Sequence, residues 1–242
     1  MGIAAVQKIQ NLHNWVSELP VEIRDEIGQR FVNRKLTDGE HLFHQGDPPD
    51  ACFQVAKGRF KVCNYNYSGQ ELVHAYLKEG DCIGDWGLLI DQPRMNNAVS
   101  CDSTEVHVLR KVHFFELYDK YPEIPRALNQ VMAQRLRLAF MLAEDASLLP
   151  LRQRLARAVI RMGHSLGHVD RDGRITIEQL SQDELANVVG ATRPSVGREL
   201  KKLEQEGSIE IKYGKLIIKD IDSFGEQYDQ LLSVEPVVPD YN

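Results

Sequence analysis

Apolar residues recur at helical spacing in two short stretches of the last third of the chain, and a glycine separates these stretches. In the first stretch Leu185, Val188 and Val189 share one face of a helix. Ser181 stands where it can cap the N-terminus, and two acidic residues follow in the first turn, where the helix dipole favours negative charge. Gly190 interrupts this helix. The pattern predicts the first helix of a helix-turn-helix.

The second stretch predicts a recognition helix. Thr192 can cap it, and Pro194 falls in its first turn, where a missing N–H costs nothing. Val196, Leu200 and Leu203 recur toward the interior, so basic and hydroxyl side chains face outward. Arginine suits guanine O6 and N7, while serine and lysine suit phosphate or either base, so this face predicts contacts with DNA. The residues that we assign to DNA binding are Ser181, Gln182, Thr192, Arg193, Ser195, Arg198 and Lys201.

A hairpin follows the predicted recognition helix. Residues 209–212 and 215–219 read as two strands joined at Tyr213-Gly214. Capping residue, glycine turn, outward basic residues and hairpin thus occur in the order of a winged DNA-binding module. The alternative is a small helical domain with an ordinary solvated face, which does not account for this order.

The first half of the chain has a different pattern of elements. Residues 6–19 and 21–31 are helix candidates separated by Pro20, and short strands with frequent glycines follow. This spacing is typical of a compact antiparallel roll or barrel. The candidate strands are 52–56, 60–63, 72–77 and 106–109, with a turn at 66–70.

The longest helical pattern covers residues 124–149. Its apolar surface is wider than packing on one neighbour requires, so one stripe can face the roll and another a second copy of the helix, in coiled-coil fashion. Pro150 ends this helix and is the natural hinge before a further helix at 151–166.

Together these elements predict an α+β protein. An antiparallel β-roll domain (a double-stranded β-helix, jelly-roll-like) precedes a long dimerisation helix and a C-terminal winged helix-turn-helix domain. We place the N-terminal helices and roll at 1–121, the dimerisation helix at 122–149, the DNA-binding domain at 150–220 and a C-terminal tail at 221–242. The tail is expected to be loose from Pro236 onward.

Composition locates the DNA-binding surface. The 242 residues carry a formal net charge of −6, yet residues 150–220 hold 13 Lys and Arg against 10 Asp and Glu. This small excess favours base contacts over non-specific attraction to phosphate. The sequence has neither a run of about eighteen apolar residues nor a signal-peptide pattern, so we expect a cytoplasmic protein. The four cysteines lack C-x-x-C spacing, and we expect buried thiols at Cys52, Cys63, Cys82 and Cys101.

Two motifs carry a family resemblance. Residues 80–88, GDCIGDWGL, lie in the roll, and residues 192–198, TRPSVGR, open the recognition helix. With roll, long helix and winged helix-turn-helix in this order, the chain resembles the CRP/FNR family of bacterial transcription regulators. The resemblance implies a homodimer held by the long helix, a cyclic-nucleotide-binding-like roll that responds to an effector, and a palindromic operator. The implied partners are double-stranded DNA, a second copy of the chain and, for an activator, RNA polymerase; no cofactor, metal or membrane is expected.

The effector pocket departs from the cyclic-AMP-binding members that the chain resembles. There a glycine and a glutamate, matched here by Gly84 and Asp85, hold the ribose, and an Arg-Ser pair grips the cyclic phosphate. Asn96 and Asn97 stand in place of that pair, and a neutral amide cannot replace a guanidinium fork against a phosphate. We expect Arg94, which lies in a turn, to be a solvated surface group; the alternative is that it turns inward and restores the missing charge.

The adenine contact also fails in this comparison. The two small hydroxyl residues that reach the adenine are matched here by Ala139 and Phe140. We therefore expect a degenerate pocket and no control by cyclic AMP. Its residues are Gly84, Asp85, Trp86, Arg94, Asn96, Asn97, Ala139 and Phe140.

Other sensor types of the family find no match. Residues 1–40 contain no cysteine for an iron–sulfur cluster, and Trp86 stands where the haem-binding carbon monoxide sensor has a histidine ligand. His41 and His44 are three apart on an expected strand, so they should point to opposite faces and form a poor metal pair. His74 and His107 are expected to be polar surface or satisfied core residues. An unassigned ligand, thiol chemistry at the roll cysteines, or no ligand remains.

The recognition helix departs as well. Many members carry a glutamate just after the arginine matched by Arg193, and Pro194 cannot make that contact with cytosine, so their half-site is not assumed here. Two hypotheses stay open: a dimeric, sequence-specific transcription regulator, or a cytoplasmic ligand or redox sensor that acts through the roll with DNA binding secondary. No catalytic constellation stands out, so an enzyme is not expected.

Overall fold

The computed structural model of the chain describes residues 7–9, 12–69, 71–178, 180–228 and 237–239. The described residues form two compact units that divide between Ala133 and Gln134, with residues 7–9 in the C-terminal unit. The division falls inside the long helix α4 (Glu123–Leu148).

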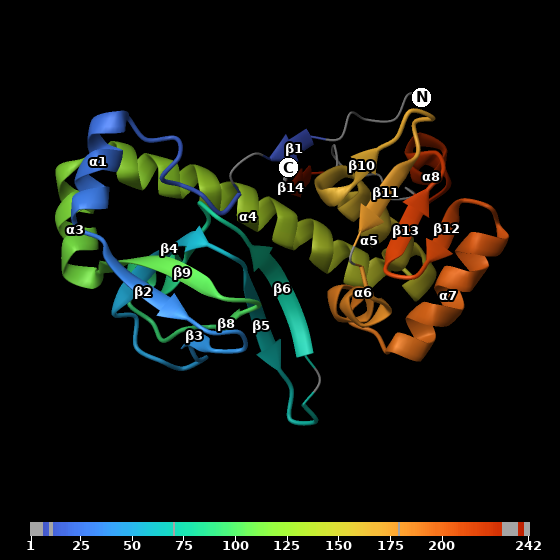
Figure 1. Cartoon of the computed structure of the whole chain (residues 1–242), viewed down its shortest axis with the longest axis horizontal. Helices are drawn as coiled ribbons and strands as arrows, with labels where there is room; N and C mark the ends of the chain where they lie inside the picture. Colours follow the sequence, from blue (N-terminus) through green and yellow to red (C-terminus); the bar gives the residue numbers. More distant parts are fainter. Residues whose placement is uncertain (1–6, 10–11, 70, 179, 229–236, 240–242) are drawn as a thin grey trace. The chain divides into compact units, whose positions relative to one another are not determined.

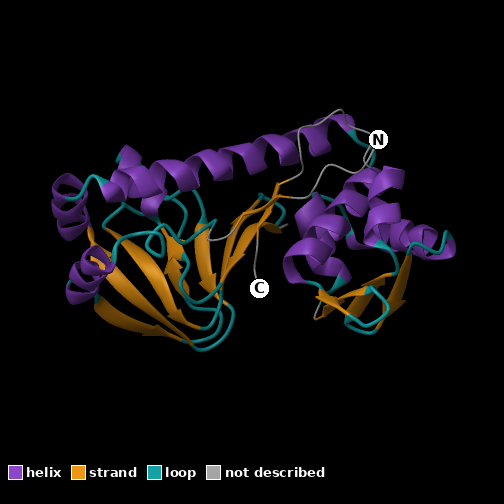
Figure 2. Ribbon diagram, turned by 90° about the horizontal axis from the view of Figure 1, so that it is seen from above, coloured by secondary structure: helices purple, strands orange, loops and turns teal. Residues whose placement is uncertain are grey.

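The N-terminal unit contains a roll of two four-stranded antiparallel sheets (Figures 1 and 2). The first sheet has the order β2 (Val32–Leu36), β9 (Thr104–Arg110), β4 (Ala51–Lys57), β7 (Cys82–Ile83). The second has the order β3 (His41–Phe43), β8 (Asn97–Ser100), β5 (Phe60–Tyr65), β6 (Glu71–Leu77). Apolar side chains of all eight strands form one buried cluster that includes Phe53, Phe60 and Val106. The predicted antiparallel roll is confirmed.

Helices cover the outer face of the first sheet. α1 (Val21–Gln29), α3 (Lys111–Lys120) and the start of α4 bury a second apolar cluster with Cys52 of β4 and Leu109 of β9. Phe114 is 1% exposed at its centre and lies edge-on to Trp15, with ring centroids 6.1 Å apart. The sequence pattern predicted neither α3 nor the short helix α2 (Asp85–Ile90) that follows β7.

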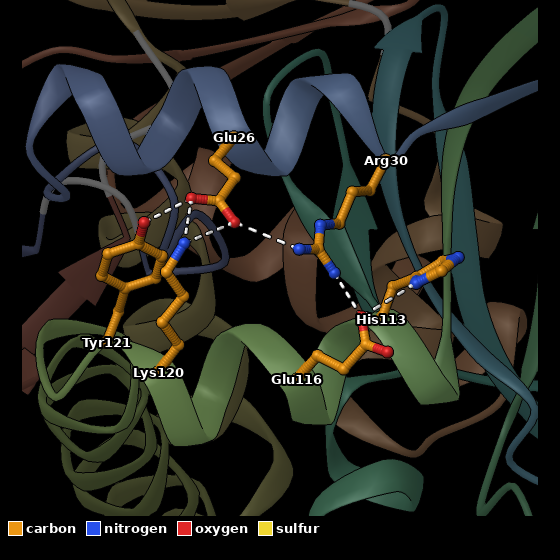
Figure 3. A network of polar contacts seen from close by, with 6 residues as sticks. All are labelled: Glu26, Arg30, His113, Glu116, Lys120 and Tyr121. Atoms are coloured by element: carbon orange, nitrogen blue, oxygen red, sulfur yellow. Dashed lines mark hydrogen bonds and ion pairs between the residues drawn. The ribbon is translucent and has the colours of Figure 1, made fainter.

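A network of polar contacts ties these helices together (Figure 3). Glu26 of α1 accepts hydrogen bonds from Lys120, at 2.8 Å, and from the Tyr121 hydroxyl. Arg30 bridges Glu26 and Glu116, and His113 lies 3.2 Å from Glu116. The bonds from Lys120 and Tyr121 lower the pKa of Glu26 to about 2.

The prediction of a helix at residues 6–19 is wrong. Residues 12–19 form turns, and the earlier part of the range holds a short strand, β1 (Gln7–Ile9), with residues 6, 10 and 11 outside the described residues. The Asn14 carboxamide accepts the Ser17 N–H at 3.0 Å, and the Ser17 hydroxyl donates to the Asn14 carbonyl. Such local side-chain bonds offer the backbone an alternative to the helix.

The C-terminal unit combines helices with a four-stranded sheet. The sheet has the order β10 (His168–Val169), β11 (Ile175–Glu178), β13 (Lys215–Ile218), β12 (Ile209–Lys212). Its helices are α5 (Leu151–Leu166), α6 (Gln182–Val189), α7 (Arg193–Gln205) and α8 (Ile221–Tyr228). They share one core in which Leu155, Val196 and Ile218 are fully buried. The predicted hairpin is confirmed, and β10–β11 adds a second one.

The segment from residue 221 is more than a tail. α8 buries Phe224 and Tyr228 in the core of the C-terminal unit, so the end of this core lies beyond the boundary expected at residue 220. A short strand, β14 (Val237–Pro239), pairs in parallel with β1. Pro236, where the loose tail was expected to begin, lies outside the described residues.

A buried ion cluster spans the corner at Pro150. Asp145 of α4 is 3% exposed and accepts hydrogen bonds from Arg157 at 2.8 Å and from Arg161 at 2.6 Å, both on α5. A carboxylate held by two arginines is the arrangement that a buried charge requires. The end of α4 and the middle of α5 are therefore bound to each other.

Candidate nucleic-acid interface and effector pocket

The start of α6 follows the predicted capping pattern. The Ser181 hydroxyl accepts the Glu184 N–H at 3.1 Å, and the Glu184 carboxylate accepts the Ser181 N–H at 2.8 Å, which completes a capping box. Gly190 ends the helix in the left-handed conformation, with φ of 64°. Leu185 and Ala186 are buried against α5 and α7.

The recognition helix α7 buries one face and exposes the other. Val196, Leu200 and Leu203 are at most 1% exposed. Arg193, Arg198 and Lys201 are exposed, and Ser195 is half-buried between them. Thr192 occupies the N-cap position, but its side chain makes no capping bond, so the expected hydroxyl cap is wrong.

The outward side chains of α7 hold one another. The Thr192 hydroxyl donates to Ser195 Oγ at 2.9 Å, and Arg198 Nη2 donates to the same oxygen at 3.1 Å. Arg193 Nη1 lies 3.6 Å from the Asp183 carboxylate of α6. Both arginines of the predicted DNA face therefore have a protein partner. Sequence reasoning missed Asp183 as a partner, although its place in the first turn of α6 was visible.

The start of α6 lies close to α7. A Cβ added at Gly197 would stand 3.0 Å from Gln182 Oε1, tighter than most real contacts. Gln182 and Ser181 are thus brought beside the second turn of α7, and Lys201 lies about one turn further along. Six of the seven residues assigned to DNA binding gather in one region, and the seventh extends it.

The hairpin β12–β13 presents a fully exposed aromatic tip. Tyr213 is exposed, with Gly214 in the left-handed conformation beside it. Lys212 pairs with Glu210 at 3.1 Å and Lys215 with Glu178 at 2.5 Å. The charge of this hairpin is therefore largely balanced within its own sheet.

Arg94 is buried, and the expectation that it is a solvated surface group is wrong. Its side chain is 2% exposed, and Nη1 donates to the Gly84 carbonyl at 2.7 Å. Nη2 donates to the Ala51 carbonyl and lies 3.3 Å from Asp50. The guanidinium also lies 4.5 Å from the centroid of the Phe43 ring. These partners come from distant parts of the sequence, which a local turn argument does not consider.

Gly84 makes this burial possible. Its φ of 85° is left-handed, and a Cβ there would stand 2.5 Å from Arg94 Nη1. Burial lowers the pKa of Arg94, and Asp50 opposes that change. The space next to Gly84 is thus occupied by the Arg94 side chain.

The other pocket residues differ in burial. Asp85 opens α2 and is 3% exposed, whereas Trp86 is exposed. Asn97 is buried, accepts the Gln45 N–H at 3.1 Å and donates to the Cys63 carbonyl at 3.2 Å. Asn96 donates to Asn64. Ala139 and Phe140 lie on the part of α4 that belongs to the other unit.

Comparison with known families agrees with both halves of this geometry. The family described as "Cyclic nucleotide-binding domain" matches residues 33–121, which hold the roll. The family described as "Crp-like helix-turn-helix domain" matches residues 153–225, which hold α6 and α7. This chain belongs to the CRP/FNR family of DNA-binding transcription regulators.

Individual relatives and a solved structure match across most of the chain. The cyclic AMP receptor protein of Thermus thermophilus is 28% identical over 190 residues, covering 78% of this chain and 85% of the relative. The cAMP-activated global transcriptional regulator Vfr of Pseudomonas aeruginosa is 28% identical over 201 residues, covering 80% and 92%. The solved structure of the c-di-GMP responsive global regulator CLP of Xanthomonas campestris has a TM-score of 0.73 and 20% identity, covering 82% and 99%. The second of these relatives is named as a transcriptional regulator, and the solved structure supports the fold.

Histidines of this CRP/FNR regulator are arranged differently from the prediction. The rings of His41 and His44 are stacked, with centroids 4.2 Å apart, so they do not point to opposite faces. β3 ends at Phe43 and its pairing with β8 shifts there, which turns His44 to the side of His41. Across the described part of the chain, no group of three or more His, Cys, Asp or Glu side chains could hold a metal ion.

The regulator's cysteines are poor candidates for thiolate chemistry. Cys52, Cys63 and Cys82 are buried and Cys101 is half-buried, all as free thiols. Burial raises the pKa of Cys52, Cys63 and Cys101, which disfavours the reactive thiolate. Among the residues described, none of the helices has the length and apolar character needed to cross a membrane.

Proposed function

We propose that this CRP/FNR regulator is a homodimer that reads a palindromic operator with two copies of α7 and does not require cyclic AMP. The observation that carries the proposal is the pair of exposed arginines, Arg193 and Arg198, with the half-buried Ser195 between them, on a helix whose opposite face is buried. A helix presented in this way can enter the major groove and reach base edges with its first turns.

Symmetry follows from the geometry of such a module. A dimer of helix-turn-helix domains places its two recognition helices about one helical turn of DNA apart, so a palindrome with half-site centres about 10 bp apart is expected. Selection of duplexes from a random pool by the wild-type protein, followed by footprinting, tests this. Enrichment of sequences without two-fold symmetry would contradict it.

Exposed apolar side chains on α4 support the dimer. Leu136, Phe140 and Leu148 are between 57% and 66% exposed, and Leu142 is 40% exposed. So many large apolar side chains on one helix indicate a surface that a partner covers. A second copy of α4 is the partner whose pattern matches, as in a coiled coil.

The dimer is tested by sedimentation of wild type, Leu142→Glu and Leu138→Glu. A buried glutamate at the interface should give monomers that bind the selected palindrome weakly, because a buried charge without a partner is costly. Glu144→Gln is the control, since it changes an exposed polar position of the same helix. A wild-type monomer at micromolar concentration that still binds the palindrome would refute the dimer.

The hydrogen bonds of Arg94, Asn96 and Asn97 support independence of cyclic AMP. Two donors of Arg94 already bind the carbonyls of Gly84 and Ala51, and Asn96 and Asn97 offer amides to neighbouring protein groups. A phosphate would have to displace these bonds. Loss of a charge-assisted hydrogen bond is worth about 1.5–3 kcal/mol, or roughly ten- to a hundred-and-fifty-fold in affinity.

Calorimetry with cyclic AMP and cyclic GMP tests this part. Wild type should show no low-micromolar binding, and operator affinity should be the same with and without either nucleotide. Low-micromolar binding that Arg94→Ala abolishes would show that the guanidinium leaves its carbonyl partners for the phosphate.

A further inference from the structure

The two arginines of the DNA face are held by different kinds of partner. Arg198 donates to Ser195, a residue of its own helix, whereas Arg193 pairs with Asp183 on the preceding helix. The carboxylate oxygen of Asp183 lies 3.6 Å from Nη1 of Arg193. The side chains of Arg193 and Asp183 are 66% and 64% exposed, so both stand on the surface that would meet DNA.

Of the two acidic residues in the first turn of α6, Asp183 is the one that pairs with the recognition helix. The neighbouring Glu184 is committed to the capping box, where its carboxylate accepts the N–H and the hydroxyl of Ser181. The close approach of Gln182 to Gly197 keeps the start of α6 beside α7. The position of the Asp183 carboxylate relative to Arg193 is therefore set by two well-anchored helices.

The pairing uses one corner of the guanidinium. Asp183 lies at Nη1, whereas reading a guanine requires two N–H groups on one edge, directed at O6 and N7. The edge formed by Nε and Nη2 is compatible with that readout while Nη1 keeps its carboxylate. A long side chain held in this way loses less rotamer freedom on binding.

We propose that Asp183 is a positioning residue for Arg193 that makes the regulator discriminate between its operator and other DNA. The proposal rests on the proposed role of α7 in reading bases. In the cognate complex the carboxylate orients the guanidinium edge toward a guanine. In other complexes, which consist of phosphate contacts, the same negative charge repels the DNA backbone.

These two effects have opposite signs, and this sets the expectation for Asp183→Asn. Affinity for the operator should fall by about three- to fivefold, the size expected for an exposed ion pair that orients a contact. Affinity for unrelated DNA should rise by about twofold, because one negative charge leaves the DNA-facing surface. A residue that only stabilised α6 would weaken both complexes together.

The experiment measures the dissociation constants of full-length protein for two duplexes at one salt concentration. One duplex is the most enriched sequence from the random pool, and the other is its scrambled version of equal length and composition. The variants are Asp183→Asn, Asp183→Glu, Arg193→Ala and the double variant Asp183→Asn with Arg193→Ala. Asp183→Glu keeps the charge and should retain most of the operator preference.

Asp172→Asn is the matched control. Asp172 also forms an exposed pair with an arginine, Arg174, at 2.7 Å, and it lies in the β10–β11 turn of the same unit. Its substitution removes the same charge and should leave the ratio of the two affinities unchanged. An equal change of that ratio in Asp172→Asn would overturn the assignment to Asp183.

The variants distinguish a failure of this inference from a failure of the proposed function. If Arg193→Ala leaves operator affinity unchanged, α7 does not read bases through Arg193 and the proposed function fails. If Arg193→Ala weakens operator binding while Asp183→Asn leaves it unchanged or weakens both duplexes equally, only the role of Asp183 fails. In support of that role, Asp183→Asn should no longer weaken operator binding once Arg193 is alanine, and only the small gain from the removed negative charge should remain.

Discussion

The roll and the helix-turn-helix use arginine in opposite ways. The Arg94 side chain is 2% exposed, and its two terminal nitrogens donate to carbonyl groups of the roll itself. Arg193 is 66% exposed, and a single carboxylate stands 3.6 Å from it. Arg94 is part of the structure of the roll, whereas Arg193 is held loosely enough to exchange its partner.

This difference separates a residue that builds a fold from one that binds a ligand. A buried guanidinium is tolerated only where the protein supplies acceptors and an aromatic face, because leaving it unpaired costs several kcal/mol. An exposed ion pair contributes about 0–1 kcal/mol and leaves the cation available. The C-terminal unit contains both cases, since Asp145 holds Arg157 and Arg161 in its interior.

The largest expected effect is on the buried cluster at Pro150. Asp145→Ala leaves two arginines without their carboxylate and should lower the free energy of unfolding of the C-terminal unit by about 3–5 kcal/mol. Denaturant unfolding measures this. Glu144→Ala, at the exposed neighbouring position, should cost far less, and similar losses in the two variants would mean that the cluster adds no stability.

Arg94→Ala should have the next largest effect, on the roll. The substitution leaves the carbonyls of Gly84 and Ala51 without their donor and removes the contact with Phe43. A loss of about 2–4 kcal/mol in the free energy of unfolding follows from these orphaned acceptors and the lost packing. Arg59→Ala, an exposed arginine of the same unit, is the control. Unchanged stability in Arg94→Ala would assign Arg94 to ligand binding instead.

Arg193→Ala and Arg198→Ala should show the reverse pattern. Each should weaken operator binding by about 1–3 kcal/mol, as expected for loss of a base-reading or phosphate-anchoring arginine. Stability should change by no more than about 0.5 kcal/mol, because both side chains are exposed. Equilibrium binding and thermal unfolding of the same preparations measure the two quantities. A large loss of stability in either variant with unchanged operator affinity would mean that these arginines support the fold, as Arg94 does, and do not bind DNA.

The smallest effect concerns pH. The folded pKa of Glu26, about 2, lies below its ordinary value of 4.5, so its stabilising effect is complete above pH 4.5 and is lost as the pH falls toward 2. Hydrogen bonds from His113 and Arg30 also lower the pKa of Glu116, which adds to the same window. Unfolding of Glu26→Gln should therefore depend less steeply on pH there than wild type. Glu22→Gln, on the same helix, should keep the wild-type slope; a flattened slope in both variants would contradict the role of Glu26.

Local sequence signals were sufficient for the helix-turn-helix. The cap at Ser181, the interruption at Gly190 and the apolar spacing of α7 were each predicted from a few residues. In the structure Ser181 caps α6, Gly190 ends it and the apolar face of α7 is buried. The DNA role of the seven assigned residues stays a prediction. Short elements such as α2 and β10 were missed because a few residues carry too little periodicity to identify them.

Long-range contacts account for the error at Arg94. Arg94 is buried by Gly84, ten residues before it, and by Ala51 and Phe43, which no local window around residue 94 contains. The wrong helix at residues 6–19 has a local cause instead. Hydrogen bonds between Asn14 and Ser17 that involve side chains and backbone override the apolar helical pattern there.

The corner at Pro150 has a mechanical consequence. A proline between two helices can serve as a swivel, but here rotation would have to pull the buried Asp145 carboxylate away from Arg157 and Arg161. The two arginines lie one turn apart on α5, so they resist twisting as well as bending. A rotation of the C-terminal end of α4 is therefore transmitted to α5. Because α5 shares its core with α7, the recognition helix turns with it.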